Sequence, residues 1–344
     1  MKKTKKIIWI ILFIILTTVA LVFTLRLYND YKYGNEGVSK YEYYKNVTDI
    51  QLYPKQIDGI DVKYIDEGAF QGFHMNPKNK IYKGVVICYG GSEGSPNFET
   101  AERLAKNGYE TLAVFIFGMK NQPKTLARIP LEQFKDVLKY VDTFIENKEP
   151  ITVFGASKGA EYALNLAGKY NRISNVILFA PSAYNFAGLD FNDYGSSWTW
   201  ENKEIPFIDI KKSSFPALIK NMLIPMLVKS PIQYKETYNS AVDQDLENYT
   251  KLIPVADIKA NILMIAGAED QMWESLEMAK MIQSQNNNAV IVSYENAGHI
   301  FAGNGVINTP DMRILVGGTL EYNEKARLDS NKIIDDFLQQ NHRK

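Results

Sequence analysis

Strand and helix patterns alternate along the chain from Gly84 onward, and this alternation constrains the fold more than any other feature. Apolar runs of strand length occur at Val85–Tyr89, Thr111–Phe117, Ile151–Phe154, Val176–Phe179, Ile262–Ala266 and Val290–Tyr294. Helical patterns occur at Phe98–Asn107, Leu131–Asn147, Lys158–Lys169, Met272–Gln285 and Glu324–Gln340. Because strands that alternate with helices form mostly parallel sheets covered by helices on both faces, the sequence predicts an α/β fold.

A β-hairpin is predicted ahead of this core. Residues 62–75 contain two short alternating stretches that are separated by Glu67-Gly68, a pattern typical of two strands and a turn. The whole α/β domain is expected to cover residues 61–344.

Residues 182–259 interrupt the alternation and are far longer than an ordinary loop. They separate the sixth predicted core strand from the seventh when the two hairpin strands are counted. The segment has aromatic and proline-rich stretches and a helical pattern around Ala217–Val228. Since open α/β sheets bind ligands at the carboxyl ends of their strands, we expect this insertion to form a cap over that edge.

The N-terminal part of the chain predicts attachment to a membrane. Residues 1–6 are basic, and Ile7–Leu25 carries no charge over a length that can cross the hydrocarbon core as a helix. By the positive-inside rule, residues 1–26 form a signal anchor with a cytoplasmic N-terminus and an extracytoplasmic domain. Secretion after signal cleavage is the alternative, although the apolar run exceeds an ordinary signal sequence. Residues 27–60 are polar and Tyr-rich and are expected to form a stalk.

Composition narrows the classes of partner. Lys and Arg together number 39, as do Asp and Glu, so no net field favours nucleic acid. Cys88 is the only cysteine and lies in an apolar run, which predicts a buried strand thiol and excludes an intramolecular disulfide. The sequence shows no Cys/His cluster with metal-ligand spacing, and it predicts neither a metal nor a cofactor.

The segment Gly155-Ala156-Ser157-Lys158-Gly159 follows an apolar strand and precedes a helix rich in Ala and Leu. A G-x-S-x-G sequence in that place forms a sharp strand-to-helix turn, which holds the serine at a helix N-terminus clear of the sheet. Ser157 is therefore the predicted nucleophile. A serine that only caps a helix is the simpler alternative.

A serine hydroxyl needs a base, and the chain has three histidines. His342 lies in the charged C-terminal tail, where a solvated side chain is expected, and His74 lies in the predicted hairpin. His299 lies just after the last predicted strand, in the segment Tyr294-Glu295-Asn296-Ala297-Gly298-His299. Since that position falls at the same sheet edge as Ser157, His299 is the predicted base.

An acid is expected after the preceding strand, since α/β-hydrolases order their triad as Ser, Asp, His. Glu269 and Asp270 both follow Ile262–Ala266. The spacing from Gly267 favours Asp270, which would orient the imidazole and stabilise its charged form.

The glycine-rich turn Tyr89-Gly90-Gly91-Ser92-Glu93-Gly94 follows the first core strand. This position normally supplies one donor of an oxyanion hole. We expect the N–H of Gly91, or alternatively of Ser92, to act with the N–H of Lys158. A plain Gly-rich turn is the alternative interpretation. Phosphate binding is not expected, because the turn lacks the G-K-[ST] ending of a phosphate-binding loop.

These residues resemble the C-terminal domain shared by acyl-CoA thioester hydrolases and bile-acid-CoA:amino acid N-acyltransferases. The similarity runs from about Val62 to Leu338. It rests on the GGSEG turn, the GASKGAE elbow, the IPVADIKANILMIAGAEDQMWESLEMAKMI stretch and the AGHIF step. The resemblance places nucleophile, acid and base on Ser157, Asp270 and His299, and it implies an α/β-hydrolase fold related to dienelactone hydrolases.

The resemblance implies a serine hydrolase that cleaves acyl thioesters through an acyl-enzyme. The N-acyltransferase branch is associated with a cysteine nucleophile, so a serine resembles the hydrolase branch. Because the predicted topology places the domain outside the cytoplasm, the alternative is a carboxylesterase or acyltransferase for a non-CoA acyl substrate. A non-catalytic binding protein that retains the fold is a further alternative.

Overall fold

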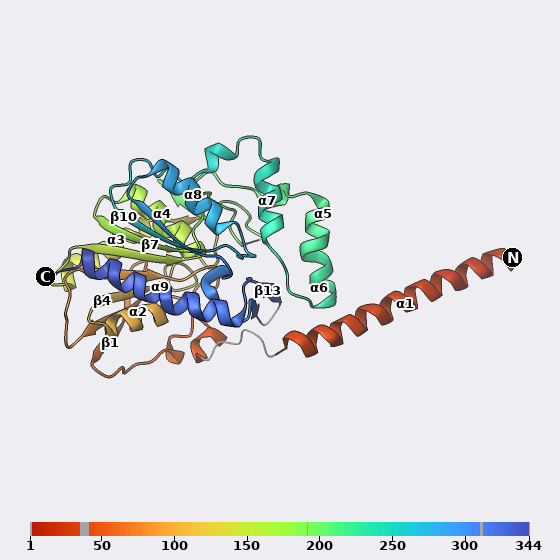
Figure 1. Ribbon diagram of the computed structural model, residues 1–344, viewed down its shortest axis with the longest axis horizontal. Helices are drawn as coiled ribbons and strands as arrows, with labels where there is room; N and C mark the ends of the chain where they lie inside the picture. Colours follow the sequence, from red (N-terminus) through yellow and green to blue (C-terminus); the bar gives the residue numbers. More distant parts are fainter. Residues whose placement is uncertain (1, 35–40, 191, 310–311, 344) are drawn as a thin grey trace.

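The computed structural model describes residues 2–34, 41–190, 192–309 and 312–343. At its centre is an eight-stranded sheet with the order β1-β2-β4-β3-β6-β7-β10-β11 (Figure 1). Its strands are β1 (Ile60–Glu67), β2 (Phe70–Pro77), β3 (Val85–Tyr89), β4 (Glu110–Val114), β6 (Ile151–Ala156), β7 (Ile173–Phe179), β10 (Asn261–Gly267) and β11 (Ala289–Tyr294). The pairs β1–β2 and β2–β4 are antiparallel, and the other neighbours are parallel.

Helices cover both faces of this sheet, as expected for parallel strands that are apolar on both sides. The helices are α2 (Phe98–Lys106), α3 (Phe134–Phe144), α4 (Lys158–Lys169), α8 (Ser275–Gln285) and α9 (Leu320–Asn341). Side chains of α2 and α9 pack into one core cluster, and side chains of α3, α4 and α8 pack into the other. The predicted α/β fold with a mostly parallel sheet is confirmed.

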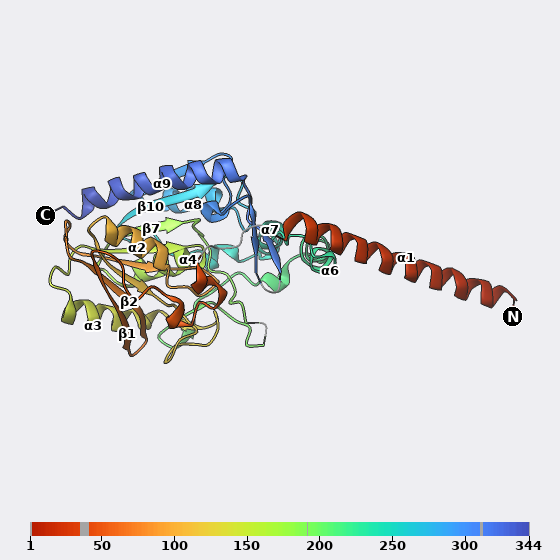
Figure 2. The same ribbon diagram turned by 90° about the horizontal axis from the view of Figure 1, so that it is seen from below.

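The insertion predicted at 182–259, hereafter the cap, lies between β7 and β10. It holds β8 (Trp198–Trp200), β9 (Lys203–Glu204), η4 (Ile210–Lys212), α5 (Phe215–Leu218), η5 (Ile219–Leu223), α6 (Ile224–Val228), α7 (Lys235–Gln244) and η6 (Asn248–Lys251). Figure 2 shows β7 and β10 pointing toward the side of the molecule where α6 and α7 lie. The cap therefore stands at the carboxyl edge of the sheet.

Small elements that the sequence did not predict complete this edge. A three-stranded sheet joins β5 (Ile129–Pro130) to β8 and β9, and β12 (Val306–Asn308) pairs with β13 (Arg313–Leu315). Two further short helices, η3 (Leu131–Gln133) and η7 (His299–Phe301), lie beside them in the chain. Strands of two or three residues are too short to show the alternation that identifies a strand in a sequence.

The segment predicted as a stalk differs from that expectation over part of its length. After residues 35–40, which lie outside the described residues, η1 (Glu42–Lys45) and η2 (Ile50–Leu52) pack onto the domain. Tyr43 and Tyr53 are each 2% exposed and stack with ring centroids 4.6 Å apart. Aromatic rings bury large apolar areas, so these tyrosines fix the segment against α2.

The N-terminal helix α1 (Lys2–Tyr33) extends away from the domain (Figure 1). It is long and apolar enough to cross a membrane. The helix continues past the predicted end of the anchor at residue 26, and its last turns contact the cap. The side chain of Asn29 is buried there and donates to the carbonyl of Val228 at 2.9 Å.

The expectation that His342 is solvated is wrong. His342 is buried and forms hydrogen bonds with Thr152 Oγ1 at 2.6 Å and with the carbonyl of Lys83 at 2.7 Å. The tail is polar by composition, but α9 carries it back across the starts of the central strands, where the imidazole is enclosed. His74 is also buried, between Tyr140 and Glu110.

Candidate active site

Ser157 occupies a strained turn between β6 and α4. Its φ of 55° and ψ of −120° lie in a region that L-residues rarely adopt. The flanking glycines make the turn possible: a Cβ on Gly155 would lie 2.0 Å from the carbonyl oxygen of Gly159, and a Cβ on Gly159 would lie 2.0 Å from that of Gly90. Backbone strain of this kind persists where the surrounding structure enforces it, and it is common at functional sites.

The structure brings Ser157 and His299 into hydrogen-bond contact. The Oγ of Ser157 lies 2.8 Å from Nε2 of His299. His299 follows β11 and is held by its backbone, because its N–H donates to the carbonyl of Val316 at 2.6 Å. Ile300 and Phe301 directly after it both have positive φ angles, so the loop that carries the imidazole is itself strained.

Asp270 completes a continuous chain of polar contacts. Its Oδ2 lies 2.8 Å from Nδ1 of His299, and its Oδ1 accepts from the N–H groups of Met272 at 2.8 Å and Trp273 at 3.2 Å. Asp270 is 1% exposed, whereas the neighbouring Glu269 is exposed to solvent. The geometry therefore favours Asp270 over Glu269 as the partner of the imidazole.

The residues expected to form the oxyanion hole lie beside Ser157, with one complication. A Cβ built on Gly91 would lie 3.2 Å from the Cβ of Ser157, so this glycine adjoins the serine. Its N–H donates to both carboxylate oxygens of Glu93 at 3.1 Å. Lys158 is the first residue of α4, so its N–H has no acceptor within the helix. In this conformation Gly91 must release Glu93 before it can bind an oxyanion.

The comparison with protein families decides the class of this fold. The model of the family described as BAAT / Acyl-CoA thioester hydrolase C terminal matches residues 129–343, which is more than half of the chain. The chain belongs to this family. The resemblance inferred from the elbow, the acid loop and the histidine loop is thereby confirmed.

The chain is also similar to individual proteins that are named as acyl-CoA thioesterases. Human "Acyl-coenzyme A thioesterase 6" is 23% identical over 280 residues, which cover 77% of this chain and 61% of that protein. Mouse "Peroxisomal succinyl-coenzyme A thioesterase" is 24% identical over 282 residues, covering 76% and 60%. This chain thus spans about three fifths of the length of these relatives.

A solved structure of a hydrolase shares the fold of this chain. Pyrococcus horikoshii acylaminoacyl peptidase superposes with a TM-score of 0.50 at 15% sequence identity, covering 84% of this chain and 43% of that chain. At this level of identity the likeness concerns the fold alone.

A buried ion pair that the sequence analysis missed ties the elbow to the cap. Nζ of Lys158 lies 2.8 Å from Oε2 of Glu161 and donates to Ser197 Oγ at 2.8 Å. The other oxygen of Glu161 accepts from the N–H of Phe186 at 3.0 Å and from Nε1 of Trp198 at 2.7 Å. Burial lowers the pKa of Lys158 and raises that of Glu161, because desolvation disfavours both charges.

These contacts fix how the cap sits on the nucleophile turn. Lys158 and Glu161 are 1% and 0% exposed, and all their cap partners come from residues 186–198. The K-x-x-E spacing at the start of the helix was the available signal. Since i,i+3 pairs usually lie on helix surfaces, that signal does not reveal a buried role.

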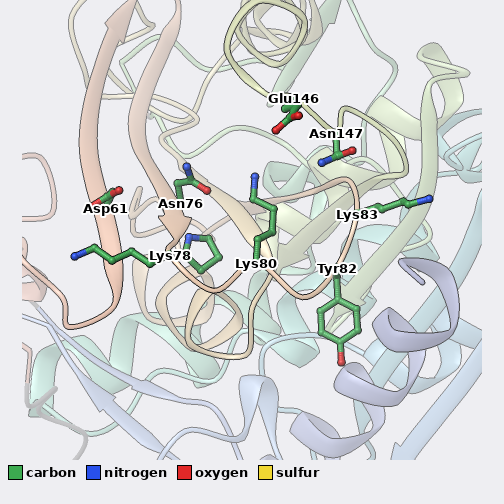
Figure 3. A pocket seen from close by; sticks show the side chains of 9 residues that line it. Asp61, Asn76, Lys78, Lys80, Tyr82, Lys83, Glu146 and Asn147 are labelled. Atoms are coloured by element: carbon green, nitrogen blue, oxygen red, sulfur yellow. The ribbon is translucent and has the colours of Figure 1, made fainter. Parts of the chain in front are cut away.

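The atoms of this site are enclosed. Ser157 is 8% exposed and His299 is 3% exposed. A surface hollow of about 620 Å³ lies instead at the opposite edge of the sheet, where the parallel strands begin (Figure 3). Lys78, Lys80 and Lys83 line it together with Glu146. None of the predicted site residues faces that hollow, so it is separate from the chemistry of Ser157.

Proposed function

We propose that this protein is a serine hydrolase that cleaves acyl thioesters through an acyl-enzyme intermediate. The observation that carries the proposal is the unbroken contact chain from Ser157 Oγ through His299 to Asp270, with both distances at 2.8 Å. Family membership and the names of the thioesterase relatives support the choice of a thioester.

The first half of the reaction forms the acyl-enzyme. Ser157 Oγ attacks the acyl carbonyl carbon while His299 Nε2 takes the hydroxyl proton, and Asp270 stabilises the imidazolium. The negative charge that develops on the carbonyl oxygen is met by the N–H of Lys158 and a donor from the Gly91–Ser92 turn. When the tetrahedral species collapses, the thiol leaves with the proton returned by His299.

Water then completes the cycle. His299 removes a proton from a water molecule that attacks the acyl-enzyme, and the second tetrahedral species expels Ser157 Oγ, which recovers that proton. The products are a carboxylic acid and a thiol, and the enzyme is restored. If an amine or alcohol replaced water at this step, the same residues would catalyse acyl transfer.

A fluorophosphonate probe and a substrate panel test the proposal. We expect the probe to label the wild-type chain and not Ser157→Ala, and we expect acyl-CoAs of graded chain length to release thiol. Failure on every acyl-CoA with turnover of simple aryl esters would indicate the carboxylesterase alternative. An acceptor-dependent conjugate with added amino acids would indicate a transferase, and absence of labelling would indicate a binding protein.

We also propose that α1 is retained as a membrane anchor, with the N-terminus in the cytoplasm. The apolar run exceeds an ordinary signal sequence, which supports retention. Just beyond the run, Asp30 pairs with Lys229 at 3.1 Å and with Arg313 at 2.6 Å, which fixes the end of α1 to the domain. Protease digestion of intact cells tests the topology, because an extracytoplasmic domain is cleaved without lysis and a cytoplasmic one is protected.

A further inference from the structure

A helical segment of the cap exposes an unusual amount of apolar surface. Residues 215–228, hereafter the cap helix, comprise α5, η5 and α6. Its exposed large side chains are Phe215 at 70%, Leu223 at 55%, Ile224 at 51%, Met226 at 51% and Leu227 at 55%. Soluble proteins rarely expose contiguous apolar patches unless the patch contacts a partner, a ligand or a membrane.

The charged residues within the stretch that holds the cap helix have one sign, although Lys229 pairs with Asp30 and Lys212 with Asp245. Residues 211–229 contain Lys211, Lys212, Lys220 and Lys229 and no Asp or Glu. Lys220 is the only exposed charged residue within the helix itself. An apolar face with lysines at its ends and flank matches a helix that lies in a membrane interface, where long side chains reach the anionic headgroups.

The cap helix lies next to the candidate membrane span. Its C-terminal end contacts α1 through the Asn29–Val228 hydrogen bond and the Asp30–Lys229 ion pair. Asn29 comes four residues after Leu25, so the contact lies roughly 6 Å along the helix axis from the end of the apolar run. Figure 1 shows the cap helix running across α1 rather than along it, on the side of the domain from which α1 extends.

We propose that the cap helix docks on the bilayer that α1 spans, and that the Ser157 site takes a long-chain acyl ester or thioester carried by a membrane lipid. A helix that crosses a spanning helix near the end of its apolar run lies in the plane of the interface. The carboxyl edge of the sheet faces the same side (Figure 2). The substrate part of this proposal rests on the proposed hydrolase function, whereas the docking part does not.

Hydrogen bonds connect the cap helix to the loops of the site. Proline has no backbone N–H, so Pro225 cannot donate to the carbonyl of Asn221 one turn earlier. The N–H of Gln233 donates to this carbonyl instead, at 3.2 Å. The side chain of Gln233 donates to that of Gln271, and the N–H of Lys235 donates to the carbonyl of Gln271 at 3.0 Å. Since Gln271 follows Asp270, a movement of the cap helix at the membrane is transmitted to the site.

A second connection reaches the histidine loop. Ile232, four residues after the cap helix, pairs with Ile314 of β13, and its N–H donates to the carbonyl of Arg313 at 2.8 Å. Two residues beyond Ile314, Val316 accepts the N–H of His299. Ser157 is 8% exposed, so an acyl chain needs a displacement of the cap to reach it. Docking of the cap helix on lipid is the event that supplies this displacement.

Fluorescence quenching tests the docking. The full chain with Met226→Cys is labelled with an environment-sensitive dye and reconstituted into phosphatidylcholine–phosphatidylglycerol vesicles that contain acyl-chain spin-labelled lipid. Cys88 is fully buried and burial raises the pKa of its thiol to about 12, so it stays unlabelled. The control is Val290→Cys, which is 55% exposed at the start of β11 on the opposite sheet edge.

We expect the spin label to quench the dye at position 226 and not at position 290. Equal absence of quenching at both positions overturns the docking proposal. Crosslinking between two unlabelled copies of Met226→Cys through their thiols would also overturn it, because the patch would then be an interface between chains.

Activity on two forms of substrate tests the substrate class. In Leu223→Ser/Leu227→Ser, hydrolysis of a vesicle-borne long-chain acyl ester should fall by about tenfold or more, because two exposed apolar side chains no longer enter the lipid. Hydrolysis of a water-soluble short-chain aryl ester should stay unchanged, as should both activities in Val290→Ser. An equal loss on both substrates, or equal wild-type activity on lipid-free acyl-CoA, overturns the lipid substrate. If the wild-type chain hydrolyses nothing, the proposed function fails while the quenching still decides the docking.

Discussion

Asp270 and His299 are joined by a contact of 2.8 Å between Oδ2 and Nδ1, and the second carboxylate oxygen of Asp270 is held by two backbone N–H groups. A carboxylate accepts hydrogen bonds only, so Nδ1 must carry the proton and Nε2 is left free to accept from Ser157. The rigid fixation of Asp270 therefore sets the tautomer of the imidazole that the proposed mechanism requires.

Replacing Asp270 by Asn should reverse this tautomer. The amide NH₂ can donate to Nδ1, which moves the imidazole proton to Nε2 and removes the base from Ser157. We expect kcat to fall by about 10⁴-fold with little change in fold. Glu269→Gln is the matched control, because Glu269 is exposed and makes no contact with the imidazole among the described residues, and its activity should equal that of the wild type. A comparable loss of activity in both variants would contradict the assignment of the acid role to Asp270.

The Lys158–Glu161 pair gives a prediction about stability. Glu161→Gln keeps an acceptor for Phe186 and Trp198 but leaves the buried ammonium of Lys158 without its carboxylate. Removing one partner of a buried pair costs about 3–5 kcal/mol, so the denaturant midpoint should fall accordingly. Lys158→Met/Glu161→Gln should recover most of this loss, because no buried charge remains.

A surface pair provides the comparison for that measurement. Lys280 and Glu277 lie 2.7 Å apart with side chains 55% and 60% exposed. Lys280→Met should change the free energy of unfolding by less than about 1 kcal/mol. If the double variant at 158 and 161 is as unstable as Glu161→Gln alone, the loss arises from packing of the cap and not from the unpaired charge.

Glu93 should restrain the enzyme, because its carboxylate accepts the Gly91 N–H that is expected to face an oxyanion. In Glu93→Ala this N–H is free before substrate arrives. We expect kcat/KM for a short-chain thioester to rise several-fold without a change in pH optimum. A fall in kcat/KM would instead show that Glu93, which also accepts from Ser95 Oγ at 2.6 Å, organises the loop, and would favour the Ser92 N–H as the donor.

The sequence predicted the inner strands β3, β4, β6, β7 and β10 because they are mostly apolar runs that are buried on both faces. The ends of these apolar runs predict the ends of the strands less well. The apolar run 111–117 extends past β4, which stops at Val114, because Phe115 and Ile116 are buried in the loop that follows the strand. Burial, and not strand pairing, explains their apolar character.

The same distinction applies to the candidate site. The contact of Ser157, Asp270 and His299 could be predicted, because the three residues lie in the loops just after β6, β10 and β11, so local sequence places them at one sheet edge. The partners of Lys158 could not be predicted, since Phe186 and Ser197 lie 28 and 39 residues away and depend on how the cap folds. Likewise, a charged residue such as Glu93 is expected to face solvent, and only the geometry of the turn brings its carboxylate back to the N–H of Gly91.

Burial of His342 should make stability depend on pH. Its Nδ1 faces the carbonyl of Lys83, which can only accept, so Nδ1 carries the proton and Nε2 accepts from Thr152. Asn175 donates to Thr152 Oγ1 at 3.1 Å, which directs the hydroxyl proton toward the imidazole. This network satisfies a neutral imidazole, and burial lowers the pKa of His342 below its usual 6.5.

Because the folded-state pKa is the lower one, the unfolded chain binds a proton first as the pH falls. The stabilisation is therefore complete above the unfolded value of 6.5 and is lost as the pH falls from there toward the folded-state pKa. We expect the free energy of unfolding of the full chain to decrease over that window. His342→Gln should be less stable at pH 7.5 by about 1 kcal/mol, because it loses hydrogen bonds, but should show a flatter pH dependence. An unchanged slope in His342→Gln would assign the pH dependence to other groups.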